Sequence, residues 1–109
     1  MQERKELGKI THAEFGRYPD RPFLFGLQLG FEFGGCGIFD GGKYTINISD
    51  ACKREKFDRS DALNSIIDFT NKTLVDAKVD YVSELIGKPV EITLESNRFM
   101  GFRILTEVI

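Results

Sequence analysis

The segment spanning residues 23–33 constrains the fold most, because large apolar side chains occupy every second position in it. The odd positions carry Phe23, Phe25, Leu27, Leu29, Phe31 and Phe33. The even positions carry Leu24, Gly26, Gln28, Gly30 and Glu32. Side chains alternate between the two faces of a β-strand, so this pattern predicts a long strand with one apolar face. A helix would scatter the same residues around its whole circumference.

Shorter alternating segments predict strands on both sides of this one. Residues 9–15 come before it and residues 44–49 come after it. The second segment follows Asp40-Gly41, a dipeptide suited to a tight turn, and we expect it to pair antiparallel with the long strand. Near the end of the sequence, residues 90–95 and 100–108 alternate around a turn at residues 96–98, which predicts a hairpin.

One main helix is predicted over residues 60–78. Ser60 can cap its N-terminus, and Asp61 lies where the helix dipole favours an anion. One face carries an apolar stripe at helical spacing, which we expect to face a core: Leu63, Ile66, Ile67, Thr70, Leu74 and Ala77. Residues 82–86 predict a short helical turn, which Gly87 and Pro89 end.

These elements predict an α+β fold with the order β-β-β-α-β-β. We expect an antiparallel sheet of about five strands, with the one main helix packed on one face. The chain has 109 residues, which is the size of one domain, so residues 1–109 are predicted to form a single domain.

Composition excludes several classes of protein. The net charge of −2 argues against nucleic-acid binding, which depends on many cationic contacts to phosphate. No apolar run is long enough to predict a membrane span, and the charged start of the chain does not resemble a signal peptide. We therefore expect a cytoplasmic protein, in which Cys36 and Cys52 are free thiols.

The sequence contains no recognisable catalytic, cofactor-binding or metal-binding constellation. His12 is the only histidine, and its spacing from the two cysteines supports neither a zinc site nor a Cys-His nucleophile. The Gly-Lys pairs at Lys43 and Lys88 lack the remaining residues of a phosphate-binding loop. Asp40, Asp50 and Asp58 are interpreted as solvated loop residues. We predict a protein that is not an enzyme and has no cofactor.

Three glycines on the even face of the long strand require an explanation, because each interior strand glycine costs roughly 0.5–1 kcal/mol relative to alanine. Gly26, Gly30 and Gly34 could admit a closely packed element. Alternatively, they could form a flat floor over which Gln28 and Glu32 project toward a partner.

Cationic residues near an aromatic or near glycines are the other candidate binding residues. Arg17 and Arg21 flank Tyr18, an arrangement suited to phosphate and to base stacking. Lys43 follows two glycines, and Arg103 shares a mixed face with Glu107 in the last strand. That mixed face could also mediate homo-oligomerisation.

Residues 8–16, beginning Gly8-Lys9-Ile10-Thr11-His12, together with residues 77–93 and the ending 102–109, resemble a family of small uncharacterised proteins encoded by tailed bacteriophages and prophages. The resemblance spans nearly the whole chain. It brings no assigned catalytic residues, and it implies a small protein that acts by binding.

Three functions follow as hypotheses. The first is an antagonist of a host protein, for example one of an anti-phage defence system, which the ten phenylalanines favour as a source of dry interface. The second is a protein that sequesters a nucleotide signal, with Arg17, Tyr18, Arg21, Lys43 and Arg103 as contacts. The third is a minor structural or accessory protein of the phage.

Overall fold

Six strands form one antiparallel sheet in the computed structural model, which describes residues 3–48 and 59–109. The strands are β1 (Glu3–Arg17), β2 (Leu24–Phe33), β3 (Cys36–Phe39), β4 (Thr45–Asn47), β5 (Pro89–Glu95) and β6 (Arg98–Ile104). The helices are α1 (Arg59–Ala77) and the 3₁₀ turns η2 (Val82–Leu85) and η3 (Thr106–Val108). The sheet order is β3-β2-β1-β5-β6, and β4 pairs with β2 on the same side as β3. The predicted α+β class and antiparallel sheet with one main helix are confirmed.

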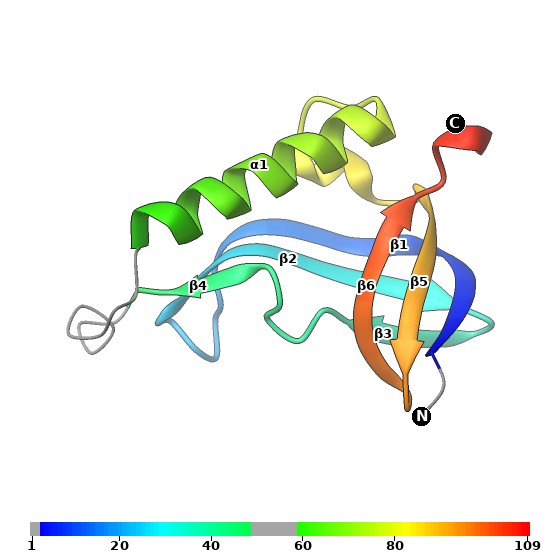
Figure 1. Ribbon diagram of the computed structural model, residues 1–109, viewed down its shortest axis with the longest axis horizontal. Coiled ribbons are helices and arrows are strands. Elements are labelled where there is room, and N and C mark those ends of the chain that lie inside the picture. Colours follow the sequence, from blue (N-terminus) through cyan, green and yellow to red (C-terminus); the bar gives the residue numbers. More distant parts are fainter. Residues whose placement is uncertain (1–2, 49–58) are drawn as a thin grey trace.

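The long strand β1 changes partner along its length. Residues 3–9 pair with β5, and residues 9–17 pair with β2. The register with β2 shifts between Ile10 and His12, which marks a bulge, and a bulge bends and twists a strand. In Figure 1 the β5–β6 hairpin stands across β2, and α1 runs above β2 with its C-terminal end toward the hairpin. The sheet therefore folds over itself and encloses the core between its two halves.

Aromatic rings join the two halves of the sheet. Phe31 of β2 is 1% exposed, and its ring centroid lies 5.1 Å from that of Phe99 and 5.0 Å from that of Phe102 in β6. Tyr44 stacks on Phe69 of α1 at 4.4 Å. Aliphatic residues fill the rest of the core, among them Ile10, Leu27, Leu29, Leu85, Val90, Ile92 and Leu94. The prediction that the odd positions of β2 face a core is confirmed at Leu27, Leu29 and Phe31.

The helix α1 rests on the core through a stripe that differs in part from the predicted one. Ile66, Phe69, Leu74 and Ala77 contact the core. Ile67 was expected among them, but it is 56% exposed, because the helix turns the face that carries Phe69 toward Tyr44 and the core. Ser60 lies inside the first helical turn, so its predicted role as the cap is wrong, and the residues before Arg59 lie outside the described part of the chain.

The closing strand is shorter than predicted and carries an irregularity. Its pairing with β5 shifts between Thr93 and Leu94, where the β6 partner changes from Gly101 to Phe99. The extra residue turns Phe99 toward the core, whereas strict alternation placed it on the opposite face. The strand ends at Ile104, and residues 106–108 form η3 in place of the expected strand.

Close packing explains two of the three glycines on β2. A Cβ at Gly30 would lie 2.8 Å from the Phe39 ring and 2.9 Å from the His12 Cβ. A Cβ at Gly26 would lie 2.5 Å from the Tyr44 carbonyl oxygen. Gly34 has φ 53° and Gly35 has φ 81°, and they connect β2 to β3 in the two-residue turn that suits a twisted hairpin.

Replacing Gly30 by valine is expected to lower the free energy of unfolding by about 1–3 kcal/mol, as in other overpacked sites. Phe39 and the β1 backbone at His12 must both move to admit the side chain. Gly37→Val is the control, because a Cβ there meets its nearest atom only at 3.8 Å. Chemical denaturation compares the two variants; equal stability would show that the surroundings of Gly30 are not tightly packed.

Candidate docking groove

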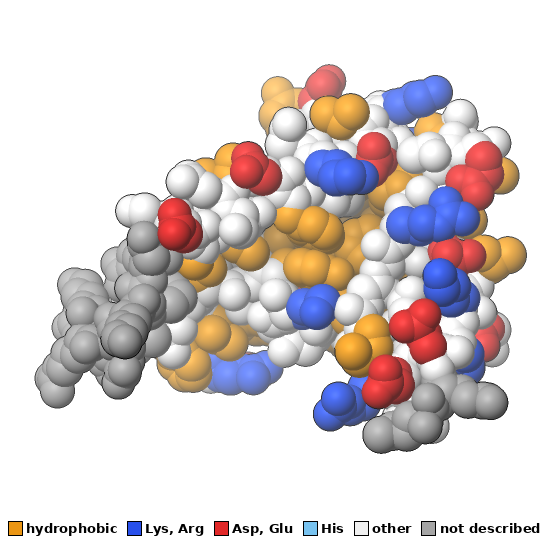
Figure 2. Space-filling view, viewed as in Figure 1, with side chains coloured by type: hydrophobic (Ala, Val, Ile, Leu, Met, Phe, Trp, Pro, Cys, Tyr) orange, Lys and Arg blue, Asp and Glu red, His pale blue; other side chains and the backbone are white. Residues whose placement is uncertain are grey.

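A groove separates α1 from β6. Its volume is about 340 Å³. The walls are formed by Phe69, Lys72, Thr73 and Asp76 of α1 and by Phe102, Arg103 and Ile104 of β6. Figure 2 shows this side of the molecule hollowed between the helix and the β5–β6 hairpin, with hydrophobic side chains at the floor and charged ones around it.

The floor of the groove is the edge of the aromatic core. The Phe69 and Phe102 rings meet edge to face, with 5.9 Å between their centroids. The buried Thr73 hydroxyl donates a hydrogen bond to the Phe69 carbonyl oxygen at 2.9 Å, so its polar atom is satisfied inside the helix. An apolar side chain entering the groove would meet the phenylalanine rings and Ile104.

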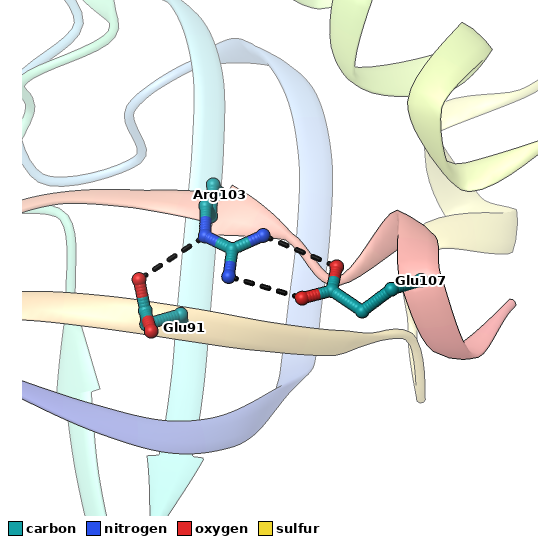
Figure 3. A network of polar contacts seen from close by, with 3 residues as sticks. All are labelled: Glu91, Arg103 and Glu107. Atoms are coloured by element: carbon teal, nitrogen blue, oxygen red, sulfur yellow. Dashed lines mark hydrogen bonds and ion pairs between the residues drawn. The ribbon is translucent and has the colours of Figure 1, made fainter.

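Charged side chains flank the groove on two rims: Lys72 and Asp76 on α1, and on β6 the Arg103 side chain, which alternation turns away from the floor that Phe102 and Ile104 form. On α1, the Lys72 Nζ lies 2.7 Å from Asp76 Oδ2. On β6, Arg103 donates from Nε to Glu91 at 3.1 Å and from its two terminal nitrogens to Glu107 at 3.2 and 3.1 Å. Figure 3 shows the guanidinium held between the two carboxylates.

This three-residue cluster carries one more acid than base. The hydrogen bonds from Arg103 lower the pKa of the Glu107 carboxyl, and those same bonds to Glu107 and Glu91 raise the pKa of the guanidinium. With two carboxyl groups and one guanidinium, the β6 rim has a formal excess of one negative charge.

One edge of β6 lies open to the groove. The Leu105 N–H donates to the Pro89 carbonyl oxygen at 3.0 Å. Hydrogen-bonded pairs alternate along an antiparallel ladder, so Arg103 and Gly101 direct their backbone groups toward β5. The N–H and C=O groups of Phe102 and Ile104 then point the other way. Since β6 is the last strand in the sheet order, no strand among the described residues pairs with them.

Of the candidate binding residues, Tyr18, Arg21 and Lys43 are brought to one place, at the far end of β1. The Arg21 guanidinium lies over the Tyr18 ring, 5.1 Å from its centroid. The Tyr18 hydroxyl donates to Asp40 Oδ1 at 3.2 Å, and the Lys43 N–H donates to the Asp40 carbonyl oxygen at 3.2 Å. Partial burial, followed by the Asp40 charge, raises the pKa of Tyr18. Arg17 is exposed at the end of β1, where it pairs with Phe25.

Asp40 joins this cluster to the sheet, and the expectation of a solvated loop carboxylate is wrong for it. It is 5% exposed. Its carboxylate accepts hydrogen bonds from the N–H groups of Leu29 and Gly42, both at 3.0 Å, besides the one from Tyr18. The carboxylate thus takes the place of a strand carbonyl where the chain loops out between β3 and β4. Asp50 and Asp58 lie outside the described residues.

Gln28 and Glu32 do not project together over a floor of glycines, as one of the two predicted explanations for the β2 glycines required. Gln28 is 8% exposed, and its side-chain amide donates to the Gly16 carbonyl oxygen at 3.2 Å, so it is a packed residue. Glu32 is exposed and pairs with Lys9 in the β1–β2 ladder. Neither residue lines the groove beside α1.

The side chains best suited to catalysis or metal binding are not gathered in one site among the described residues. His12 Nε2 lies 2.6 Å from Glu14 Oε1, and the imidazole meets Phe39 edge to face. Cys36 is an exposed free thiol at the start of β3, and Cys52 lies outside the described residues. Within residues 3–48 and 59–109, no group of three or more His, Cys, Asp or Glu residues is arranged to hold a metal ion.

The helices in the same ranges are too short or too polar to cross a membrane.

A second, almost wholly apolar groove of about 310 Å³ lies on the other side of α1. Its lining includes two exposed apolar residues, Phe15 and Ile67, with Leu74 and Val82. The Thr70 hydroxyl is buried there, and it has no hydrogen-bond partner within the described part of the chain.

Comparison of the chain with protein-family models, with curated proteins and with solved structures finds no match.

Proposed function

We propose that this chain is a non-enzymatic protein-binding module and that the groove between α1 and β6 receives its partner. The observation that carries the proposal is the combination found there: an apolar floor, a charged rim on each side and an open strand edge. The resemblance to small phage-encoded proteins supports a partner in the bacterial cytoplasm. An antagonist of a host defence protein is the function that this context favours.

The floor and the rims of the groove would contribute to partner binding in different ways. Burying one leucine or phenylalanine side chain of a partner against Phe69, Phe102 and Ile104 would contribute roughly 1.5–3 kcal/mol. The rim charges are exposed or half-buried and already paired, so they would add little affinity and mainly select the orientation and identity of the partner. Such a division is typical of protein interfaces, where an apolar centre is surrounded by a polar rim.

Nucleotide sequestration receives less support from the candidate residues. Arg103 already donates hydrogen bonds from three nitrogens to Glu91 and Glu107. The Tyr18 hydroxyl donates its hydrogen bond to Asp40. The Arg21 guanidinium covers one face of the Tyr18 ring, so a base could stack on that face only after the guanidinium moved away.

Site-specific photo-cross-linking tests the protein-binding function. We expect p-benzoylphenylalanine in place of Lys72, on the groove rim, to yield one discrete adduct in bacterial lysate, identifiable by mass spectrometry. The 75% exposed Lys72 side chain tolerates substitution, because exposed changes usually alter stability by about 0.5 kcal/mol or less.

The matched control carries the same photo-reactive residue in place of Lys9, an exposed lysine of β1 outside the groove. Its adduct should be absent or much weaker. Equal adducts from both positions would mean that the partner does not use the groove, and the absence of any adduct from position 72 would remove the proposed function.

A further inference from the structure

We propose that the partner enters the groove as an extended segment and adds a strand, antiparallel, to the open edge of β6. This inference rests on the proposed function and specifies how the groove recognises its partner. Strand addition is a recurrent mode of peptide recognition, in which main-chain hydrogen bonds provide affinity and alternate side chains provide specificity.

β6 is the edge that the sheet leaves available. At the opposite edge, β3 has four residues and β4 has three. The loop at residues 40–44 separates them, and the Asp40 carboxylate already accepts the N–H of Leu29 there. Short, interrupted edge strands resist pairing with another chain. β6 has seven residues, contains no proline, and leaves the backbone groups of Phe102 and Ile104 without a strand partner among the described residues.

The surroundings of this edge admit a single segment and exclude a second folded copy. In Figure 1 the open side of β6 faces the middle of the molecule, where α1 lies on one side and β2, β3 and β4 extend beyond it. A copy of the chain pairing there would bring its own core and helix into these elements. The groove volume of about 340 Å³ lies near the lower end of the range for small-ligand pockets, which leaves room for a few side chains of one segment.

The register fixes the chemistry of the segment. Its residues opposite Phe102 and Ile104 would point into the groove and should be apolar, because they meet Phe69 and the two β6 side chains. Its residues opposite Gly101 and Arg103 would point to the other face and should be polar. There the Glu91, Arg103 and Glu107 cluster has one excess negative charge, which favours a basic residue in the segment, next to Glu107.

Synthetic peptides test this mode without the natural partner. The probe is the capped peptide Lys-Val-Thr-Val-Thr, in which the valines are placed opposite Ile104 and Phe102. In this register the valine N–H groups face β6 and the threonine N–H groups face away. N-methylation of both valines should weaken binding about tenfold or more through the loss of two hydrogen bonds. N-methylation of both threonines should change it little.

Titration of the full chain by NMR gives affinity and location together. The expected result is saturable binding, with the largest shifts at the Phe102 and Ile104 amides and with intermolecular contacts to the peptide backbone. Replacing the lysine of the peptide by glutamate should weaken binding about two- to fivefold at low salt, which corresponds to the free energy of an exposed ion pair.

Equal affinity of the two N-methylated peptides would overturn the proposal, because side-chain contacts alone would then account for binding. So would shifts confined to the second groove, around Phe15 and Ile67, or no binding by any peptide at about 2 mM, a concentration that detects free energies near −4 kcal/mol. These outcomes are separate from the cross-linking result, which needs the natural partner and reports only whether a protein occupies the groove.

Discussion

Replacing Phe31 by alanine is expected to lower the free energy of unfolding by about 3–5 kcal/mol, the usual range for a buried phenylalanine in a tightly packed core. Phe31 is 1% exposed, and it contacts Phe99 and Phe102 from the other half of the folded sheet. The variant leaves a cavity between two rings that are anchored in β6. Urea denaturation followed by circular dichroism measures the loss.

Phe23→Ala is the matched control, because it removes the same side chain from the same alternating segment at a position that is 43% exposed. Its stability should stay within about 1 kcal/mol of the unmodified protein. If the two variants unfold at the same urea concentration, Phe31 does not join the two halves of the sheet as described.

Replacing Asp40 by alanine is expected to lower the free energy of unfolding by about 2–4 kcal/mol. Buried N–H and O–H donors that lose their acceptor are left desolvated with no compensating hydrogen bond. The Leu29 N–H lies in a residue that is 1% exposed, so water cannot replace the carboxylate there. The Tyr18 hydroxyl and the Gly42 N–H lose their acceptor as well. Thermal unfolding combined with hydrogen exchange at the Leu29 amide should show a lower melting temperature and faster exchange at this position.

Asp20→Ala is the control for the loss of one carboxylate, since Asp20 is exposed in the same region. It should change stability by about 0.5 kcal/mol or less. The stability of Asp40→Asn should fall between those of Asp40→Ala and Asp20→Ala, because the asparagine amide keeps one of the two oxygen acceptors. An Asp40→Ala variant as stable as Asp20→Ala would contradict the role assigned to this carboxylate.

The sequence predicted the fold wherever local patterns and tertiary packing agree. Alternation in β2 and β5 and the apolar stripe of α1 each identify a surface that must be buried, so those elements were recognisable. The first half of β1 was missed because its exposed, charged residues 3–6 carry no such pattern, and it is a strand only because β5 pairs with it. β3 was missed because two of its residues, Cys36 and Gly37, resemble a glycine-rich turn, although they extend the β2 ladder.

The candidate site was less accessible to sequence reasoning. Arg103 was recognised from its mixed strand face, but its two glutamate partners depend on the β5–β6 register and on η3. Phe69, Lys72, Thr73 and Asp76 carried no signal for a groove, because their role depends on where α1 lies relative to β6. The burial of Asp40 depends equally on long-range geometry, since its partners Tyr18 and Leu29 come from two other segments.

The change of partner along β1 has a consequence for how the molecule is assembled. Residues 9–17 pair with β2, which follows after a short loop, whereas residues 3–9 pair with β5, which lies far along the sequence at residues 89–95. Contacts between distant segments slow folding. During synthesis on the ribosome, residues 3–9 would lack their strand partner until the β5–β6 hairpin emerged. This unpaired segment would be accessible to chaperones and proteases in the meantime.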